Sequence, residues 1–132
     1  MSLRDDLVGV ALKWERRFGV APQITSAIGE NDAALLVGMK EEEYSAAMQG
    51  QTAVQKGFDF MFKGLRYQVK AGRSSGKPGS KVTRVSKASN LEFDYLLWLL
   101  YNPLFELQEA WQLDVDYYRR EILSIVSICA RV

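Results

Sequence analysis

The chain has 132 residues, of which 48% are hydrophobic and 25% are charged, with a formal net charge of +1 at pH 7. This composition predicts a single globular domain over residues 1–132, with a sizeable core. The absence of histidine and the presence of one cysteine, Cys129, exclude an internal disulfide, imidazole-based triads and the usual zinc ligand sets. Because its apolar runs are too short to span a bilayer and its start lacks a signal-peptide pattern, we expect a soluble cytoplasmic protein without a membrane partner.

The first predicted element is an amphipathic helix. Its apolar residues recur at helical spacing: Leu7, Ala11, Trp14 and Phe18. Acidic residues in the first turn and Gly19 just past the end place this helix from about Leu3 to Phe18. Glu15 borders the apolar stripe, so it either reaches a cleft or is a solvated charge paired with an arginine.

Two short helices are expected next, before a polar lead-in. Residues 33–37 form the first, and residues 40–48, with acidic residues in their first turn, form the second. Gly38 and Gly50 separate the elements. Residues 51–56 are expected to be extended and to lead into a hairpin.

Two alternating runs around Lys63 and Gly64 predict this hairpin. Apolar residues share one face of each strand: Phe58, Phe60 and Phe62, then Leu65, Tyr67 and Val69. A two-residue turn sets Phe62 opposite Leu65 and therefore Asp59 opposite Gln68, with Lys70 projecting to the same side. This polar side is either a chemical site or the ordinary solvent face of a hairpin.

A basic segment follows from the hairpin. Between Phe60 and Leu91 every charged residue is a cation: Lys63, Arg66, Lys70, Arg73, Lys77, Lys81, Arg84 and Lys87. Residues 72–80 are rich in Gly and Ser and are expected to form an irregular loop. Such a segment suits contact with a phosphate backbone, or it is a solvated loop that maintains solubility.

The last third of the chain predicts three elements. Residues 93–101 form either a helix or a buried strand, since periodicity does not decide between them. Alternation predicts a strand over residues 105–113. An amphipathic helix is expected from Val115 to Cys129, with Asp114 or Asp116 as its cap.

The order of these elements resembles the PD-(D/E)xK nuclease superfamily, which includes restriction endonucleases and Holliday-junction resolvases. The resemblance consists of a leading helix with a glutamate, the run Gly-Phe-Asp-Phe, a tight turn, and the run Tyr-Gln-Val-Lys-Ala. It implies a restriction-endonuclease-like α/β (α+β) fold, with a mixed central sheet of about four to five strands flanked by helices.

The resemblance also implies roles for individual residues. Asp59 matches the metal-binding acid, Lys70 the lysine, and Glu15 the glutamate that some members supply from the first helix, while the Val69 carbonyl completes the coordination. Gln68 occupies the second metal position, where the motif usually has Asp or Glu. A neutral amide there weakens the binding of a hard cation such as Mg²⁺.

The resulting expectation is a Mg²⁺- or Mn²⁺-dependent endonuclease that hydrolyses DNA phosphodiester bonds. Its DNA contacts are expected from the basic segment: Arg66, Arg73, Lys77, Lys81, Arg84 and Lys87. A homodimer is expected because nucleases of this type often dimerise. One alternative is a catalytically weak or inactive module that binds nucleic acid through its basic loop, and another is a partner-binding subunit with an aromatic dimer interface at Trp98, Trp111, Tyr117 or Tyr118.

Overall fold

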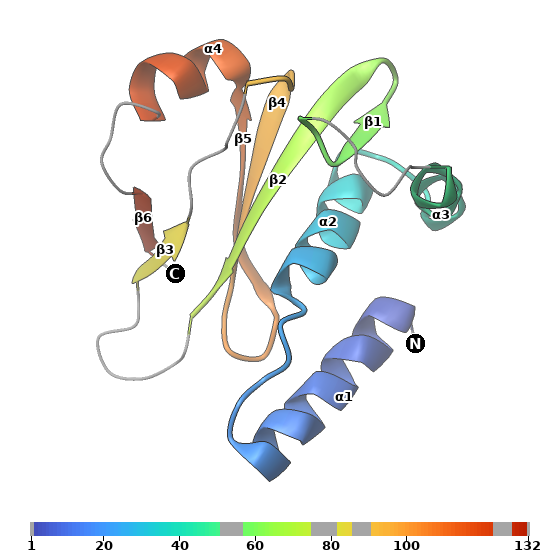
Figure 1. The fold of residues 1–132 in the computed structure, drawn as a ribbon, viewed down its shortest axis with the longest axis vertical. Helices are drawn as coiled ribbons and strands as arrows, with labels where there is room; N and C mark the ends of the chain where they lie inside the picture. The colour runs from blue at the N-terminus through green and yellow to red at the C-terminus, as the bar shows by residue number, and fades with distance from the viewer. Residues whose placement is uncertain (1, 51–56, 75–81, 86–90, 123–127, 132) are drawn as a thin grey trace.

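The computed structural model describes residues 2–50, 57–74, 82–85, 91–122 and 128–131. Within this part of the chain, a mixed sheet of four strands has the order β1-β2-β4-β5 (Figure 1). β2 runs antiparallel to β1 and parallel to β4, and β4 runs antiparallel to β5. The bounds are β1 (Phe60–Phe62), β2 (Leu65–Arg73), β4 (Tyr95–Tyr101) and β5 (Leu107–Asp114).

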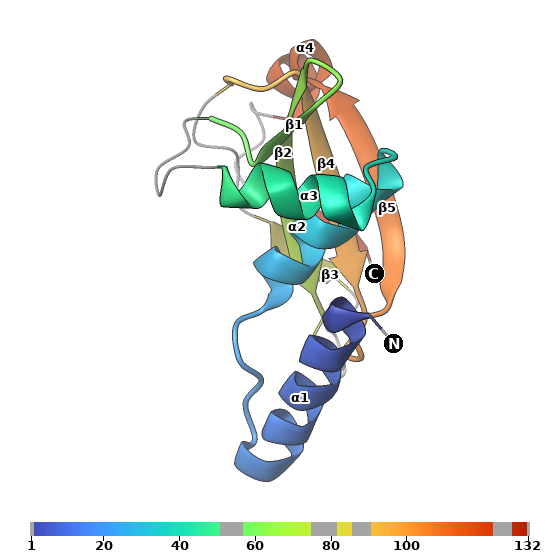
Figure 2. The ribbon, with the colours of Figure 1, turned by 90° about the vertical axis from the view of Figure 1, so that its right-hand side faces the viewer.

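Helices lie on both sides of this sheet, so the expected α+β architecture of a mixed sheet flanked by helices is confirmed. Three helices lie toward one face (Figures 1 and 2): α1 (Leu3–Phe18), α2 (Thr25–Leu36) and α3 (Glu41–Gln49). Toward the other face lie a short helix, a π-helical turn and a two-stranded antiparallel sheet: α4 (Val115–Tyr117), η1 (Tyr118–Ile122), β3 (Val82–Val85) and β6 (Ile128–Arg131).

α1 has the bounds that its sequence predicts, because a capping residue lies at each end. The Ser2 hydroxyl accepts the Asp5 N–H at 3.1 Å, which satisfies one of the free donors of the first turn. At the other end Gly19 has φ of 86°, and its N–H donates to the Glu15 carbonyl at 2.8 Å. Both devices are readable from the sequence.

α2 corrects the prediction for residues 33–37. The helix begins eight residues earlier, at Thr25, because its inner face is set by contact with the sheet. Its buried residues are Ile28, Gly29, Ala33 and Ala34. Small and polar residues in its first half weaken the apolar period, so packing rather than pattern defines this element. α3 lies one residue beyond the predicted 40–48, after an N-cap at Lys40.

Of the two possibilities left open for residues 93–101, the strand is correct, and it spans Tyr95–Tyr101 as β4. It lies between β2 and β5, and its residues alternate between two apolar clusters, which explains its continuous hydrophobicity. The strand expected over residues 105–113 spans Leu107–Asp114 as β5, and it pairs antiparallel with β4. β2 continues through Gly72 and Arg73, which the sequence assigned to the loop.

The predicted helix from Val115 to Cys129 is wrong at its last residues, where Ile128 and Cys129 belong to a strand. Asp114 caps it as expected, by accepting the Tyr117 N–H at 2.8 Å, but the described helical turns end at Ile122. Cys129 lies in β6 and is paired with Arg84 of β3. The apolar residues there suit a strand as well as a helix, and pairing with β3 decides the outcome. The predicted lead-in at residues 51–56 lies outside the described residues.

The core has two parts, one on each face of the sheet. The larger cluster joins Ile28 of α2 to Tyr67 and Val69 of β2 and to Leu97 and Leu99 of β4. The smaller cluster centres on Phe93, Leu96 and Tyr118, with Trp98 packed against it. Of the aromatic residues expected at an interface, Tyr118 is therefore buried and Trp98 half-buried, while Trp111 and Tyr117 are exposed.

Candidate functional site

The β1–β2 hairpin has the predicted register. Phe62 pairs with Leu65, and Phe60 with Tyr67. Lys63 and Gly64 both have positive φ, of 52° and 79°, as a two-residue primed turn requires. The rings of Phe60 and Tyr67 stack at 5.2 Å on the helix-covered face, which fixes the hairpin against the core.

Asp59 lies just before β1, at the exposed edge of β2. Its N–H donates to the Tyr67 carbonyl at 2.8 Å, and its Oδ2 atom accepts the Val69 N–H at 2.7 Å. The Asp59 carboxylate thus accepts a hydrogen bond from a backbone amide of β2, next to the first residue of β1. The sequence assigned the Val69 carbonyl to this site, whereas the observed contact uses the Val69 amide.

The carboxyl group beside Asp59 comes from Glu30 of α2. The preceding residue, Gly29, lies so close to β2 that an added Cβ would be 2.6 Å from the Ala71 Cβ. This close approach brings the middle of α2 onto β2, and the Glu30 and Asp59 carboxyl groups are hydrogen-bonded to each other. Glu30 was not predicted as a site residue, because no helix was expected between Phe18 and residue 33.

The two carboxyl groups share an environment that favours one proton between them. Burial raises the pKa of Glu30 to about 7, and the charge of Asp59 adds to the rise. Burial also raises the pKa of Asp59, against the opposing effects of the Val69 N–H, Glu30 and the Lys70 charge. Near neutral pH the pair therefore alternates between a state with one shared proton and a state with none, as interacting carboxyl groups do.

Tyr44 of α3 adjoins the same pair. Burial raises the pKa of its hydroxyl to about 12, and the charges of Glu30 and Asp59 add to that rise. Its ring meets the Phe60 ring edge-on, with centroids 6.4 Å apart. The hydroxyl is therefore neutral at physiological pH and places a polar group near two acids.

Lys70 approaches Asp59 from β2. Its charge lowers the pKa of Asp59, so the two groups interact electrostatically. Alternation along the strand places Gln68 and Lys70 on the face opposite to Val69, and both side chains are half-buried. The structure thus brings Asp59, Lys70 and the amide of Val69 together. Gln68 lies on β2 as well, two residues before Lys70.

Glu15 of α1 is paired with Arg73, the last residue of β2. The Arg73 Nη2 atom lies 3.1 Å from Glu15 Oε1, and the same guanidinium donates to the Pro103 carbonyl. Its Cζ atom lies 4.2 Å above the Phe105 ring. Glu15 therefore pairs with an arginine, the second possibility that the sequence left open.

Two of the six predicted DNA contacts are engaged inside the molecule. Arg73 forms the contacts just described, and the Arg66 guanidinium bonds the Asp94 carboxylate at 3.2 Å. Arg84 lies in β3. Lys77, Lys81 and Lys87 lie outside the described residues.

The oxygen ligands around Asp59 fit a hard divalent cation by type. Glu30 and Asp59 supply carboxylates, and Gln68 can add an amide oxygen from the neighbouring strand. Across the described residues no cluster of three or more His, Cys, Asp or Glu side chains could hold a metal. Any cation at this edge would therefore depend on two carboxylates and on neutral ligands.

Comparison with known proteins does not assign the chain to a family. No protein-family model matches the sequence, and the search of curated proteins returns no match. Among the described helices, none combines the length and hydrophobicity required to cross a membrane.

Proposed function

We propose that the chain is a Mg²⁺- or Mn²⁺-dependent endonuclease of the PD-(D/E)xK type that hydrolyses DNA phosphodiester bonds. The hydrogen-bonded carboxyl pair of Glu30 and Asp59, with Lys70 beside it at the edge of β2, carries this proposal. Two half-buried acids with raised pKa values next to a lysine are more typical of a reactive site than of a solvent-facing hairpin.

Each residue of the group has a distinct role in the proposed reaction. Asp59 and Glu30 hold the cation, and Gln68 offers a further oxygen. A bound Mg²⁺ or Mn²⁺ supplies charge neutralisation at the scissile phosphate and lowers the pKa of water. Lys70 orients the attacking water or stabilises the charge that develops on the phosphate.

The proton of the carboxyl pair links this site to pH. A group with a pKa of about 7 is half-protonated at neutral pH, so Glu30 must release its proton before it can bind a cation. Glu30 therefore takes the role that the family resemblance implied for Glu15.

The DNA contacts of the proposal come from the part of the basic segment that follows β2. Lys77, Lys81, Arg84 and Lys87 remain candidates, whereas Arg66 and Arg73 are bonded to Asp94 and Glu15.

The proposal also includes a homodimer and a cytoplasmic location. Fractionation of cells that produce the tagged chain tests the location.

A cleavage assay with matched variants tests the proposal. Purified protein is incubated with supercoiled, linear, nicked and branched DNA in Mg²⁺ or Mn²⁺. We expect Asp59→Asn, Lys70→Met and Glu30→Gln to lose at least about 100-fold in rate, because each removes a group that acts on the transition state. Glu15→Gln is the control and retains the rate at temperatures where it is folded. Intact DNA in every condition, or equal cleavage by Asp59→Asn, contradicts the proposal.

The second candidate function is a nucleic-acid-binding module without catalysis. The neutral Gln68 favours it, because the site then holds fewer anionic ligands than the motif usually supplies. Calorimetric titration with Mn²⁺ separates the two candidates. Metal binding that is lost in Asp59→Asn supports the enzyme, whereas DNA binding that is unaffected by metal and by this substitution supports the module.

A further inference from the structure

α1 presents an uncovered row of large apolar side chains. We call Leu3, Leu7, Val10 and Trp14 the α1 stripe. Their exposed fractions are 77%, 40%, 61% and 52%. The buried residues of the helix, Val8 and Ala11, lie on another side. Figure 1 shows α1 at one end of the molecule. Rows of exposed apolar residues of this kind mark interaction surfaces.

The spacing of the α1 stripe is that of a coiled coil. Its residues follow one another at intervals of four, three and four, which keeps them in register with a second helix over about 18 Å. Phe18 extends the row, with its ring 4.6 Å from the Trp14 ring. A straight helix that packs only on its own domain has no need of this second apolar face.

Charges beside the α1 stripe indicate what would cover it. Asp6 and Lys13 each precede a stripe residue, so both flank the row on the same side, and both are exposed. Neither forms an ion pair with any residue that the structure describes. When two such helices pack antiparallel about a twofold axis, Asp6 of each copy lies beside Lys13 of the other. In a parallel pair the same two positions face Ala11 and Phe18, and no charges are matched.

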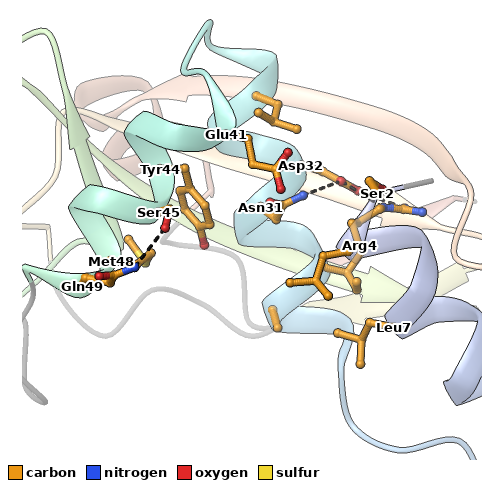
Figure 3. A pocket seen from close by; sticks show the side chains of 14 residues that line it. Ser2, Arg4, Leu7, Asn31, Asp32, Glu41, Tyr44, Ser45, Met48 and Gln49 are labelled. Carbon is orange, nitrogen blue, oxygen red and sulfur yellow. Dashed lines mark hydrogen bonds and ion pairs between the residues drawn. The ribbon is translucent and has the colours of Figure 1, made fainter.

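The antiparallel arrangement also matches the surface next to α1. It places Trp14 of the second copy against Leu3, with Leu7 facing Val10. Leu3 and Leu7 form one wall of a largely apolar groove of about 390 Å³ between α1, α2 and α3 (Figure 3). Its other apolar lining includes Ile28, Leu35 and Met48. The incoming indole thus meets the mouth of an apolar hollow.

We propose that the chain forms a twofold-symmetric dimer in which the α1 stripe packs antiparallel against the α1 stripe of a second copy. Two symmetric pairs between Asp6 and Lys13 fix the direction of the helices. A self-complementary patch of this kind closes after two subunits. The dimer does not depend on the proposed nuclease chemistry, because the carboxyl pair lies on α2 and the hairpin.

Sedimentation equilibrium at low ionic strength tests the surface. We expect the wild-type chain to dimerise, and Val10→Glu to raise the dimer Kd at least about 100-fold, because it buries a charge at the centre of the contact. Val20→Glu is the matched control. Val20 is 72% exposed but lies beyond the end of α1, so the dimer Kd of this variant should equal that of the wild type. Circular dichroism confirms that each variant is folded. A monomeric wild type, or a dimer that tolerates Val10→Glu, overturns the proposal.

Charge reversal tests the direction of the helices. Asp6→Lys and Lys13→Asp each place like charges across the contact and raise the Kd about tenfold at low salt. The double variant restores wild-type affinity. An equimolar mixture of the two single variants forms a heterodimer tighter than either homodimer. Equal dimer Kd values for the wild type, both single variants, the double variant and the mixed dimer would overturn the antiparallel arrangement. Binding of the α1 stripe to a different protein, with no self-association, would also overturn it.

Discussion

At the scale of single residues, the unusual feature is a pair of carboxyl groups that meet in a half-buried site. Glu30 and Asp59 lie far apart in the sequence, and each would be ionised in water at neutral pH. Burial and mutual repulsion make that state costly, so the pair retains a proton to about pH 7. Under the proposed function, a cation would bind only after this proton had left, so metal binding should strengthen as the pH rises through 7.

The stability of the metal-free protein should therefore depend on Glu30. Its folded-state pKa, about 7, is raised above the ordinary 4.5, so its contribution is fully present below about pH 4.5 and is lost as the pH rises through 7. Asp59, with a raised pKa, acts with the same sign. We expect Glu30→Gln to reduce the decrease in the free energy of unfolding between pH 5 and 8. At pH 8 the variant should be more stable than the wild type by on the order of 1 kcal/mol, after allowance for solvent screening.

Urea unfolding between pH 5 and 8, without metal, measures this effect. Glu15→Gln is the control: it removes the contact with Arg73 and lowers stability, but it leaves the dependence through pH 7 in place. The same fall in Glu30→Gln as in the wild type would show that the proton resides elsewhere.

Gln68 is the residue at which an added charge should strengthen the site. Gln68→Glu supplies a third carboxylate near Asp59, and an anionic oxygen binds a hard cation better than an amide does. We expect Mn²⁺ affinity to rise about tenfold and the cleavage rate to rise with it. Titration calorimetry measures the first effect, and Gln112→Glu, on exposed β5, is the matched control. Unchanged affinity would place Gln68 outside the coordination sphere.

At the scale of elements, the distance between α2 and β2 determines whether Glu30 reaches Asp59. Gly29 permits this approach, because any Cβ there would overlap the Ala71 Cβ, an atom fixed by the strand backbone. The helix cannot yield locally, since Ile28 and Ala33 on either side are buried in the same cluster. A larger residue must therefore shift the whole helix.

Gly29→Ala should weaken both the fold and the site. We expect a loss of about 1–3 kcal/mol in the free energy of unfolding from overpacking, and weaker Mn²⁺ binding because Glu30 moves with the helix. Urea unfolding and calorimetry measure the two effects. Gly9→Ala in α1 is the control: an added Cβ meets nothing within 4 Å, so helix propensity stabilises it by about 0.5–1 kcal/mol. Equal stability of both variants would refute the tight contact.

At the scale of the whole molecule, the charge distribution matters more than the net charge. The total is +1, yet the segment between Phe60 and Leu91 contains only cations, so the acids lie elsewhere. Such a separation attracts a phosphate backbone without requiring a basic protein. Arg66 and Arg73 do not add freely to this attraction, since each is paired with a carboxylate.

The salt dependence of DNA binding should report the remaining cations. Each phosphate contact contributes about −0.9 to the slope of log K against log salt concentration. We expect Lys77→Gln to reduce the slope by about 0.9, because it removes one contact. Fluorescence anisotropy with a labelled duplex measures the slopes. Arg119→Gln, an exposed residue of η1 paired with Asp116, is the control and should not change the slope. Equal slopes for all three proteins would move the DNA interface away from this segment.

Some elements follow from local signals along the chain. Ser2, the first-turn acids and Gly19 bound α1, and the Lys63–Gly64 turn with its alternating flanks sets the hairpin register. These are interactions between residues a few positions apart, so the pattern contains all the necessary information. The mixed sheet flanked by helices followed from the order of such elements.

Other features depend on packing between distant parts of the chain, so they could be read from the folded structure alone. Residues 95–101 form a strand because β2 and β5 pair with them. Cys129 lies in a strand because β3 pairs with the residues around it. Glu30 meets Asp59 because Gly29 lets α2 approach the middle of β2, whereas Glu15 is paired with Arg73 at the end of that strand. Spacing along a chain specifies which face a side chain occupies, but contact between elements specifies which side chains meet.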